Sequence, residues 1–173
     1  MSHPVAHRTA PRRRPVRSAP RGAAPLAVAV AAIAVLSGCS QAVPFDPAPD
    51  ATDPDCAAVV VRLPDEVAGL AERETNAQGT GAWGAPASVL LRCGVEPPTP
   101  TTLRCVSVDG VDWIIDESDA PRYLFTTYGR TPAVEVLVDN DEVSGTTAIA
   151  DLSPAVSVIA AERQCTNLDD LAE

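Results

Sequence analysis

The dipeptide at positions 109–110, Asp-Gly, lies between two runs of alternating apolar and polar residues, and it constrains the fold more than any other feature. A two-residue hairpin turn needs positive φ at both central residues, which Asp-Gly adopts readily. Such a turn pairs four apolar side chains on one face, Val108 with Val111 and Val106 with Trp113. The sequence therefore predicts an antiparallel hairpin over residues 104–115, with Trp113 in the core.

Other segments also have the composition of strands. Residues 88–95 predict one strand, because apolar residues alternate along it. Residues 121–130 and 133–138 predict a second hairpin that turns between positions 129 and 132. The glycine-rich residues 76–86 predict a loop.

Two segments predict helices. Residues 56–63 follow the capping residue Asp55, and residues 152–163 begin with a cap at Ser153 followed by proline. Residues 65–75 stay ambiguous, because a partial helical face is interrupted by glycine. Together, the predicted strands and helices indicate an α+β fold, with a mostly antiparallel sheet of about four to five strands. A short N-terminal helix and a C-terminal helix pack on this sheet.

The chain opens with a basic segment, then an apolar one, then small residues, which is the order of a secretory signal peptide. Residues 1–38 contain six arginines and no acid. The apolar run from Ala23 to Leu36 has 14 residues, whereas a spanning helix needs about 20. The run ends in Leu36-Ser37-Gly38-Cys39, which resembles the bacterial lipobox.

The lipobox resemblance implies cleavage after Gly38, diacylglycerol on the Cys39 thiol and acylation of the new amino terminus, for example with palmitate. We therefore expect a lipid-anchored protein at the outer face of the cytoplasmic membrane. A plain secretory signal with a chance cysteine, or an uncleaved anchor, is the alternative. The expected parts are a signal peptide over 1–38, a Pro/Asp-rich tether over 39–55 and one globular domain over 56–173.

The mature part lacks the usual catalytic side chains. Both histidines lie in the leader and the chain has no lysine, so residues 39–173 offer no imidazole and no side-chain amine. That excludes Ser-His-Asp triads and Schiff-base chemistry, although carboxylate pairs remain. We expect no enzyme activity, no cofactor and no metal site. The 23 acidic residues against seven arginines give residues 39–173 a net charge of −16, which disfavours nucleic acid as a partner.

Four cysteines remain once Cys39 carries lipid, and an exported domain favours two disulfides. Of the three possible pairings, we favour Cys93–Cys105, around a proline-rich loop, and Cys56–Cys165, between the ends of the domain. The first pairing has a difficulty, because Cys93 alternates with apolar residues while Cys105 falls on the more polar face of its hairpin. A metal site is the rival interpretation, without a Cys-x-x-Cys pair or histidine to support it.

Three residues are candidates for ligand binding. Trp83 lies in the glycine-rich segment and has two interpretations. Its indole either stacks against a bound sugar or peptide, or it acts as a plug that fills the edge of the core. Tyr128 and Arg130 lie in one turn, where the guanidinium either grips a carboxylate or phosphate or pairs with one of the many acids. Together they define a hypothetical loop cluster.

Several strings in combination resemble an actinobacterial envelope family known as domain of unknown function 3515: CAAVVVRLP, AWGAP, LRCGV, VDGVDWII, TTYGRTPAVEV and ERQC. The resemblance runs from about Cys56 to Cys165 and implies location and lineage, but no mechanism and no functional residues. We expect a membrane-anchored, non-catalytic binding or assembly module, with an envelope protein as its possible partner. The alternative is a lipoprotein that binds a small ligand or cell-wall fragment through the Trp83, Tyr128 and Arg130 cluster.

Overall fold

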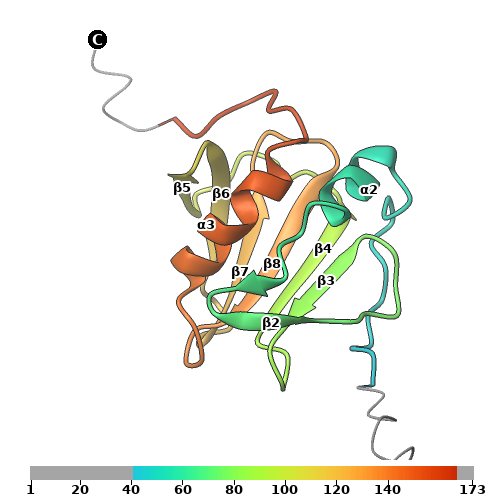
Figure 1. Cartoon of the computed structure of the whole chain (residues 1–173). Helices are drawn as coiled ribbons and strands as arrows, with labels where there is room; N and C mark the ends of the chain where they lie inside the picture. Colours follow the sequence, from blue (N-terminus) through green and yellow to red (C-terminus); the bar gives the residue numbers. More distant parts are fainter. Residues whose placement is uncertain (1–40, 167–173) are drawn as a thin grey trace, which may run out of the picture. The chain divides into compact units, whose positions relative to one another are not determined.

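The computed structural model describes residues 41–166 and shows one antiparallel sheet of eight strands with two short helices (Figure 1). The elements are α2 (Pro54–Val60), β1 (Glu66–Val67), β2 (Leu70–Arg73), β3 (Thr80–Trp83), β4 (Val89–Val95), β5 (Arg104–Val108), β6 (Val111–Asp116), β7 (Arg122–Thr127), β8 (Ala133–Asp139) and α3 (Gly145–Val156). The strands lie in the order β1-β2-β3-β4-β8-β7-β6-β5. The expectation of about four to five strands is wrong, because β1, β2 and β3 lie in residues 65–75 and 76–86, whose composition predicts no strand. The domain is still mostly sheet with helices.

The hairpin of β5 and β6 is confirmed with its register. Val108 pairs with Val111 and Val106 pairs with Trp113. Asp109 and Gly110 have φ of 49° and 78°, as the tight turn requires. The second hairpin, β7 with β8, is also confirmed.

The missed strand β3 shows why the glycine-rich segment is misleading. Gly81 lies inside this strand, where glycine is normally unfavourable. A Cβ at Gly81 would lie 2.7 Å from Leu63 Cδ1 and 2.7 Å from Trp83 Cη2. The glycine is therefore needed by side chains packed over the strand, and it does not mark a loop.

Both helices lie on one face of the sheet, with α3 packed against β8, β1 and β5 and α2 packed against β4 (Figure 1). We call the opposite face the open face. The core between helices and sheet includes the fully buried side chains Val59, Val67, Trp83, Val89, Leu91, Val111, Trp113, Val134, Val136, Ile149, Leu152 and Ile159.

Helix α2 is close to the expected position, but its N-cap is Asp53, whose side chain accepts a hydrogen bond from the Asp55 amide. Helix α3 starts earlier than expected. Its N-cap is Ser144, and the predicted start at Ser153 is wrong. The Ser153 hydroxyl instead lies 2.7 Å from the Ile149 carbonyl, one turn earlier in the same helix.

The part of the expected tether that the structure describes lies against the domain. Val43 pairs with Thr75 in an isolated bridge, and the Asp50 amide donates to the Gly94 carbonyl at 3.0 Å. Ala48 and Ala51 are buried in a small second cluster. The folded part therefore extends at least to Val43, ahead of the boundary expected at residue 56.

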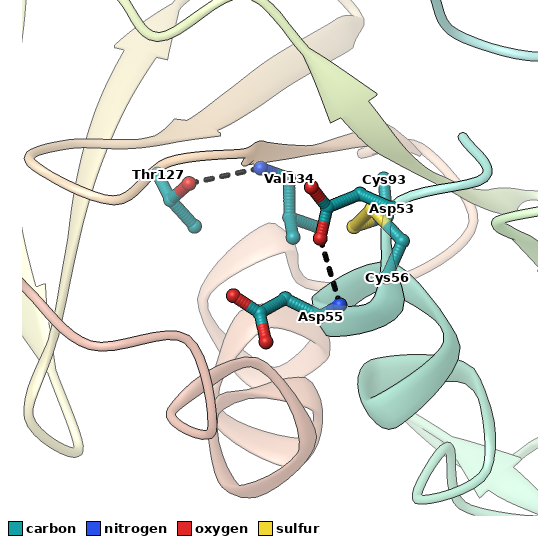
Figure 2. The surroundings of a disulfide bond; sticks show 6 residues. All are labelled: Asp53, Asp55, Cys56, Cys93, Thr127 and Val134. Carbon is teal, nitrogen blue, oxygen red and sulfur yellow. Dashed lines mark hydrogen bonds between the residues drawn. A yellow bond between two sulfur atoms is a disulfide. The ribbon is translucent and has the colours of Figure 1, made fainter. Parts of the chain in front are cut away.

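The four cysteines form two disulfides, but the favoured pairing is wrong. Cys56 pairs with Cys93 (Figure 2), and Cys105 pairs with Cys165. Cys93 and Cys105 lie on strands four steps apart in the sheet order, about 19 Å across. Cys93 also points to the core face, while Cys105 points to the open face. A bridge between them is therefore impossible in this sheet.

We predict that peptides from a non-reducing digest join Cys56 to Cys93 and Cys105 to Cys165. Under increasing reductant, Cys105–Cys165 should open first, because both of its residues are partly exposed whereas Cys56 and Cys93 are 0% exposed. In the chain-entropy model each bridge contributes about 4 kcal/mol to the free energy of unfolding. Mass spectrometry after thiol alkylation follows the order of opening, and a Cys93–Cys105 peptide or simultaneous opening contradicts the prediction.

Candidate functional site

Trp83 does not offer a binding platform. Its side chain is fully buried in β3, and the indole Nε1 donates to the Pro64 carbonyl at 3.0 Å. It closes the core beside α2, as the plug interpretation expected. Trp113 is also fully buried, in agreement with its predicted place in the core.

The expected cluster of three ligand-binding residues does not form. Across the sheet, Trp83 is level with Val89, Val138 and Tyr123 in turn. Tyr128 lies five residues beyond Tyr123, about 16 Å further along the strand direction. Trp83 is therefore far from the turn that holds Tyr128 and Arg130.

Tyr128 and Arg130 do come together, around a cavity of about 270 Å³ at the rim of the sheet. Three segments build this cavity. Its lining comes from the β5–β6 hairpin (Ser107, Gly110 and Asp112), from the turn after β7 (Tyr128 and Arg130) and from the segment that follows α3 (Ala161, Gln164 and Cys165). We call it the Arg130 cavity.

Residues 157–166 form the outer wall, and we call them the C-terminal strap. The Glu162 amide donates to the Gly129 carbonyl at 2.7 Å, and Arg130 forms an isolated bridge with Ala161. Gly129 has φ of 71°, and a Cβ there would lie 2.0 Å from the Arg163 carbonyl oxygen. Only glycine allows the strap to approach this closely.

Asp112 was not among the sequence candidates, yet it links the three segments. Its main-chain carbonyl accepts from the Tyr128 amide at 2.8 Å. Its carboxylate Oδ2 accepts from the Cys165 amide at 2.6 Å, next to the disulfide to Cys105. The available signal was its position opposite Ser107 on the polar face of the hairpin.

Arg130 is 4% exposed, which is unusual for a charged residue. Its Nη1 donates to the Ile159 carbonyl, and its Nη2 donates to the Gly110 carbonyl at 3.0 Å. Its Nε has no hydrogen-bond partner, and none of the ion pairs within residues 41–166 involves Arg130. Arg130 therefore joins the strap to the hairpin with a charge that no carboxylate contacts directly.

Two effects of opposite sign act on the pKa of Arg130. Burial lowers the pKa of the Arg130 guanidinium, and the nearby Asp112 charge raises it. An arginine stays protonated in proteins despite such effects. The cavity thus has a buried cation in its wall and a carboxylate in the same lining.

Tyr128 is partly exposed and lies between two hollows. The Arg163 guanidinium carbon is 5.6 Å from its ring centroid, within the range of a cation–π contact. On its other side Tyr128 lines a larger hollow of about 700 Å³ with Leu103, Cys105 and Ile114.

Within residues 41–166 there is no group of three or more metal-ligating side chains placed to hold a metal ion. The polar groups of the Arg130 cavity are a guanidinium, a carboxylate, a phenol, a serine hydroxyl and an amide. Such a set can bind and orient a small polar molecule through hydrogen bonds.

We predict that Arg130→Lys loosens the strap, because one ammonium cannot reproduce the planar fork that reaches two carbonyls. The free energy of unfolding should fall by about 1–3 kcal/mol. Hydrogen exchange of the Glu162 and Cys165 amides should become faster. Arg122→Lys, at an exposed arginine paired with Asp119, is the control and should change stability by less than about 0.5 kcal/mol. Unchanged exchange at both strap amides in Arg130→Lys contradicts the prediction.

Comparison with known proteins places the chain in a family but supplies no activity. A search of the curated proteins and a search of the solved structures each found no match to this chain. One family model, described as "Protein of unknown function (DUF3515)", matches residues 22–165, which is most of the sequence and includes every strand and both helices described above. On this match, the chain belongs to the DUF3515 family.

Proposed function

We propose that this chain is an actinobacterial envelope lipoprotein whose domain is a non-catalytic binding module with the Arg130 cavity as its ligand site. The observation that carries the proposal is the buried Arg130 beside a polar cavity, without a carboxylate in contact. Leaving a buried charge unpaired is costly. A bound polar ligand would offset part of that cost.

The absence of histidine and lysine from residues 39–173 supports binding over catalysis. Asp112 is the one carboxylate in the lining of the cavity, and one of its oxygens already accepts a main-chain hydrogen bond. A glycosidase-type mechanism needs two carboxyl groups across the reacting bond.

The leader supports the lipid anchor. Cys39 lies outside the described residues, so the argument rests on the order of basic, apolar and small residues before it. Within residues 41–166, no helix is long and apolar enough to cross the membrane. A lipid at Cys39 would hold the domain at the outer face of the cytoplasmic membrane.

Assembly with another envelope protein is the second candidate, favoured by the open face of the sheet. Leu90, Leu124 and Leu137 lie in one row across this face and are only partly buried. Phe45 and Pro44 lie beside the end of this row, next to Leu90 and Leu137. Partly exposed leucines in a row are typical of a surface that a partner covers.

We predict that cells fed an alkyne-bearing fatty acid incorporate it into the wild-type protein and that Cys39→Ala abolishes both the label and recovery in the membrane fraction. The reason is that Cys39 supplies the thiol and the new amino terminus for acylation. Ser40→Ala, one residue away, is the control and should keep both. Label retained by Cys39→Ala excludes the proposed anchor.

We also predict that full-length protein purified from its native membrane carries a small molecule, released on denaturation and detected by mass spectrometry. Ser107→Trp should lose it, because the indole fills the cavity that Ser107 lines. Ser118→Trp, at an exposed serine in the β6–β7 turn, is the control and should retain it. An empty cavity together with a protein cross-linked through the leucine row would favour the assembly function instead.

A further inference from the structure

We infer that the Arg130 cavity binds a small zwitterion, of the class of free amino acids, with the carboxylate at Arg130 and the ammonium at Asp112. This inference rests on the proposed function and adds the chemical class of the ligand. It follows from two opposite charges that line one small cavity without contacting each other as an ion pair.

The guanidinium side of the cavity suits a carboxylate. A guanidinium has five N–H donors, and the Ile159 and Gly110 carbonyls accept from Nη1 and Nη2. Nε is buried and has no hydrogen-bond partner. The ligand therefore contacts the Nη hydrogens that the two carbonyls do not bind. Two carbonyl dipoles do not neutralise a full charge, whereas a carboxylate does so with charge-assisted hydrogen bonds.

The carboxylate side suits an ammonium. Oδ2 of Asp112 accepts from the Cys165 amide at 2.6 Å. No hydrogen bond within residues 41–166 involves its Oδ1, and the chain has no lysine that could supply an ammonium. An ammonium donor from a ligand would complete this group.

The two opposite charges disfavour ligands that carry only one charge. Asp112 repels an anion bound at Arg130, and Arg130 repels a cation bound at Asp112. A molecule with both charges meets neither penalty. The hydroxyls of Ser107 and Tyr128 and the amide of Gln164 offer further hydrogen bonds around it.

The size of the cavity sets the class. About 270 Å³ is just below the range of cavities that hold drug-sized ligands, so a molecule with the few heavy atoms of an amino acid fits best. The C-terminal strap encloses the site on one side through Ala161, Gln164 and Cys165. A long peptide or glycan chain would need the strap to move.

Isothermal titration of the full-length, lipid-bearing protein in detergent tests the inference with three probes: glycine, acetate and methylammonium. The last two each keep one of the charged groups of glycine. We expect saturable binding of glycine and at least tenfold weaker binding of each half. No saturable glycine binding, or acetate binding as tightly as glycine, overturns the inference.

Asp112→Asn sharpens the test, because the amide oxygen can still accept from the Cys165 amide while the charge is lost. Glycine affinity should fall at least tenfold, and acetate should now bind as tightly as glycine. Asp109→Asn, in the exposed turn of the same hairpin where φ of 49° suits asparagine, is the matched control and should bind glycine like the wild type. Unchanged selectivity in Asp112→Asn overturns the assignment of the ammonium.

The two proposals fail in different ways. A small molecule that is released from the native protein and lacks an amine–carboxylate pair overturns the zwitterion while the binding module stands. A cavity empty on purification that also fails to bind glycine overturns both.

Discussion

The alternation of side chains along the strands decides which cysteines can meet, and the rest of the domain depends on that choice. Cys93 points to the core face and bonds to Cys56 on α2, while Cys105 points to the open face and bonds to Cys165 in the C-terminal strap. Each face of the sheet therefore carries one disulfide. The Cys56–Cys93 disulfide joins α2, a helix of about two turns, to the sheet. The Cys105–Cys165 disulfide holds the strap that completes the Arg130 cavity.

The sequence predicted those parts of the fold that are determined by residues close together in the chain. The β5–β6 hairpin was readable because its turn residues and its alternation agree within a dozen positions. Strand β3 was not readable, because Gly81 is required by Leu63, a contact 18 residues away in the sequence. The start of α3 was missed because the Ser153-Pro154 pair looks like a cap, although the Ser153 hydroxyl returns to the preceding turn of an existing helix.

The candidate site was predicted in part for the same reason. Tyr128 and Arg130 are neighbours in one turn, so their proximity is local. Asp112 joins them only through the cross-strand geometry of β6 and β7, and the strap has no periodic pattern that would place it against the sheet. Trp83 looked like a loop residue, because the glycines around it hid the strand that buries it.

The structural role of Arg130 and its proposed role in ligand binding place opposite demands on one side chain. As a tie between Ile159 and Gly110 it has to be buried, and burial raises the cost of its charge. A carboxylate of the protein in contact with it would lower that cost and also close the site to ligands. Asp112 instead lies close enough to raise the pKa of Arg130 without forming an ion pair, which leaves both charges available.

The net charge of residues 39–173 also affects which charged molecules approach the Arg130 cavity. A domain with a net charge of −16 repels anions before they reach the cavity, and the effect is strongest at low ionic strength. A zwitterion has no net charge, so the net charge of the domain neither attracts nor repels it at long range. The acidity of the domain therefore disfavours anions, and Arg130 disfavours a cation at Asp112, so neither effect opposes the proposed zwitterion.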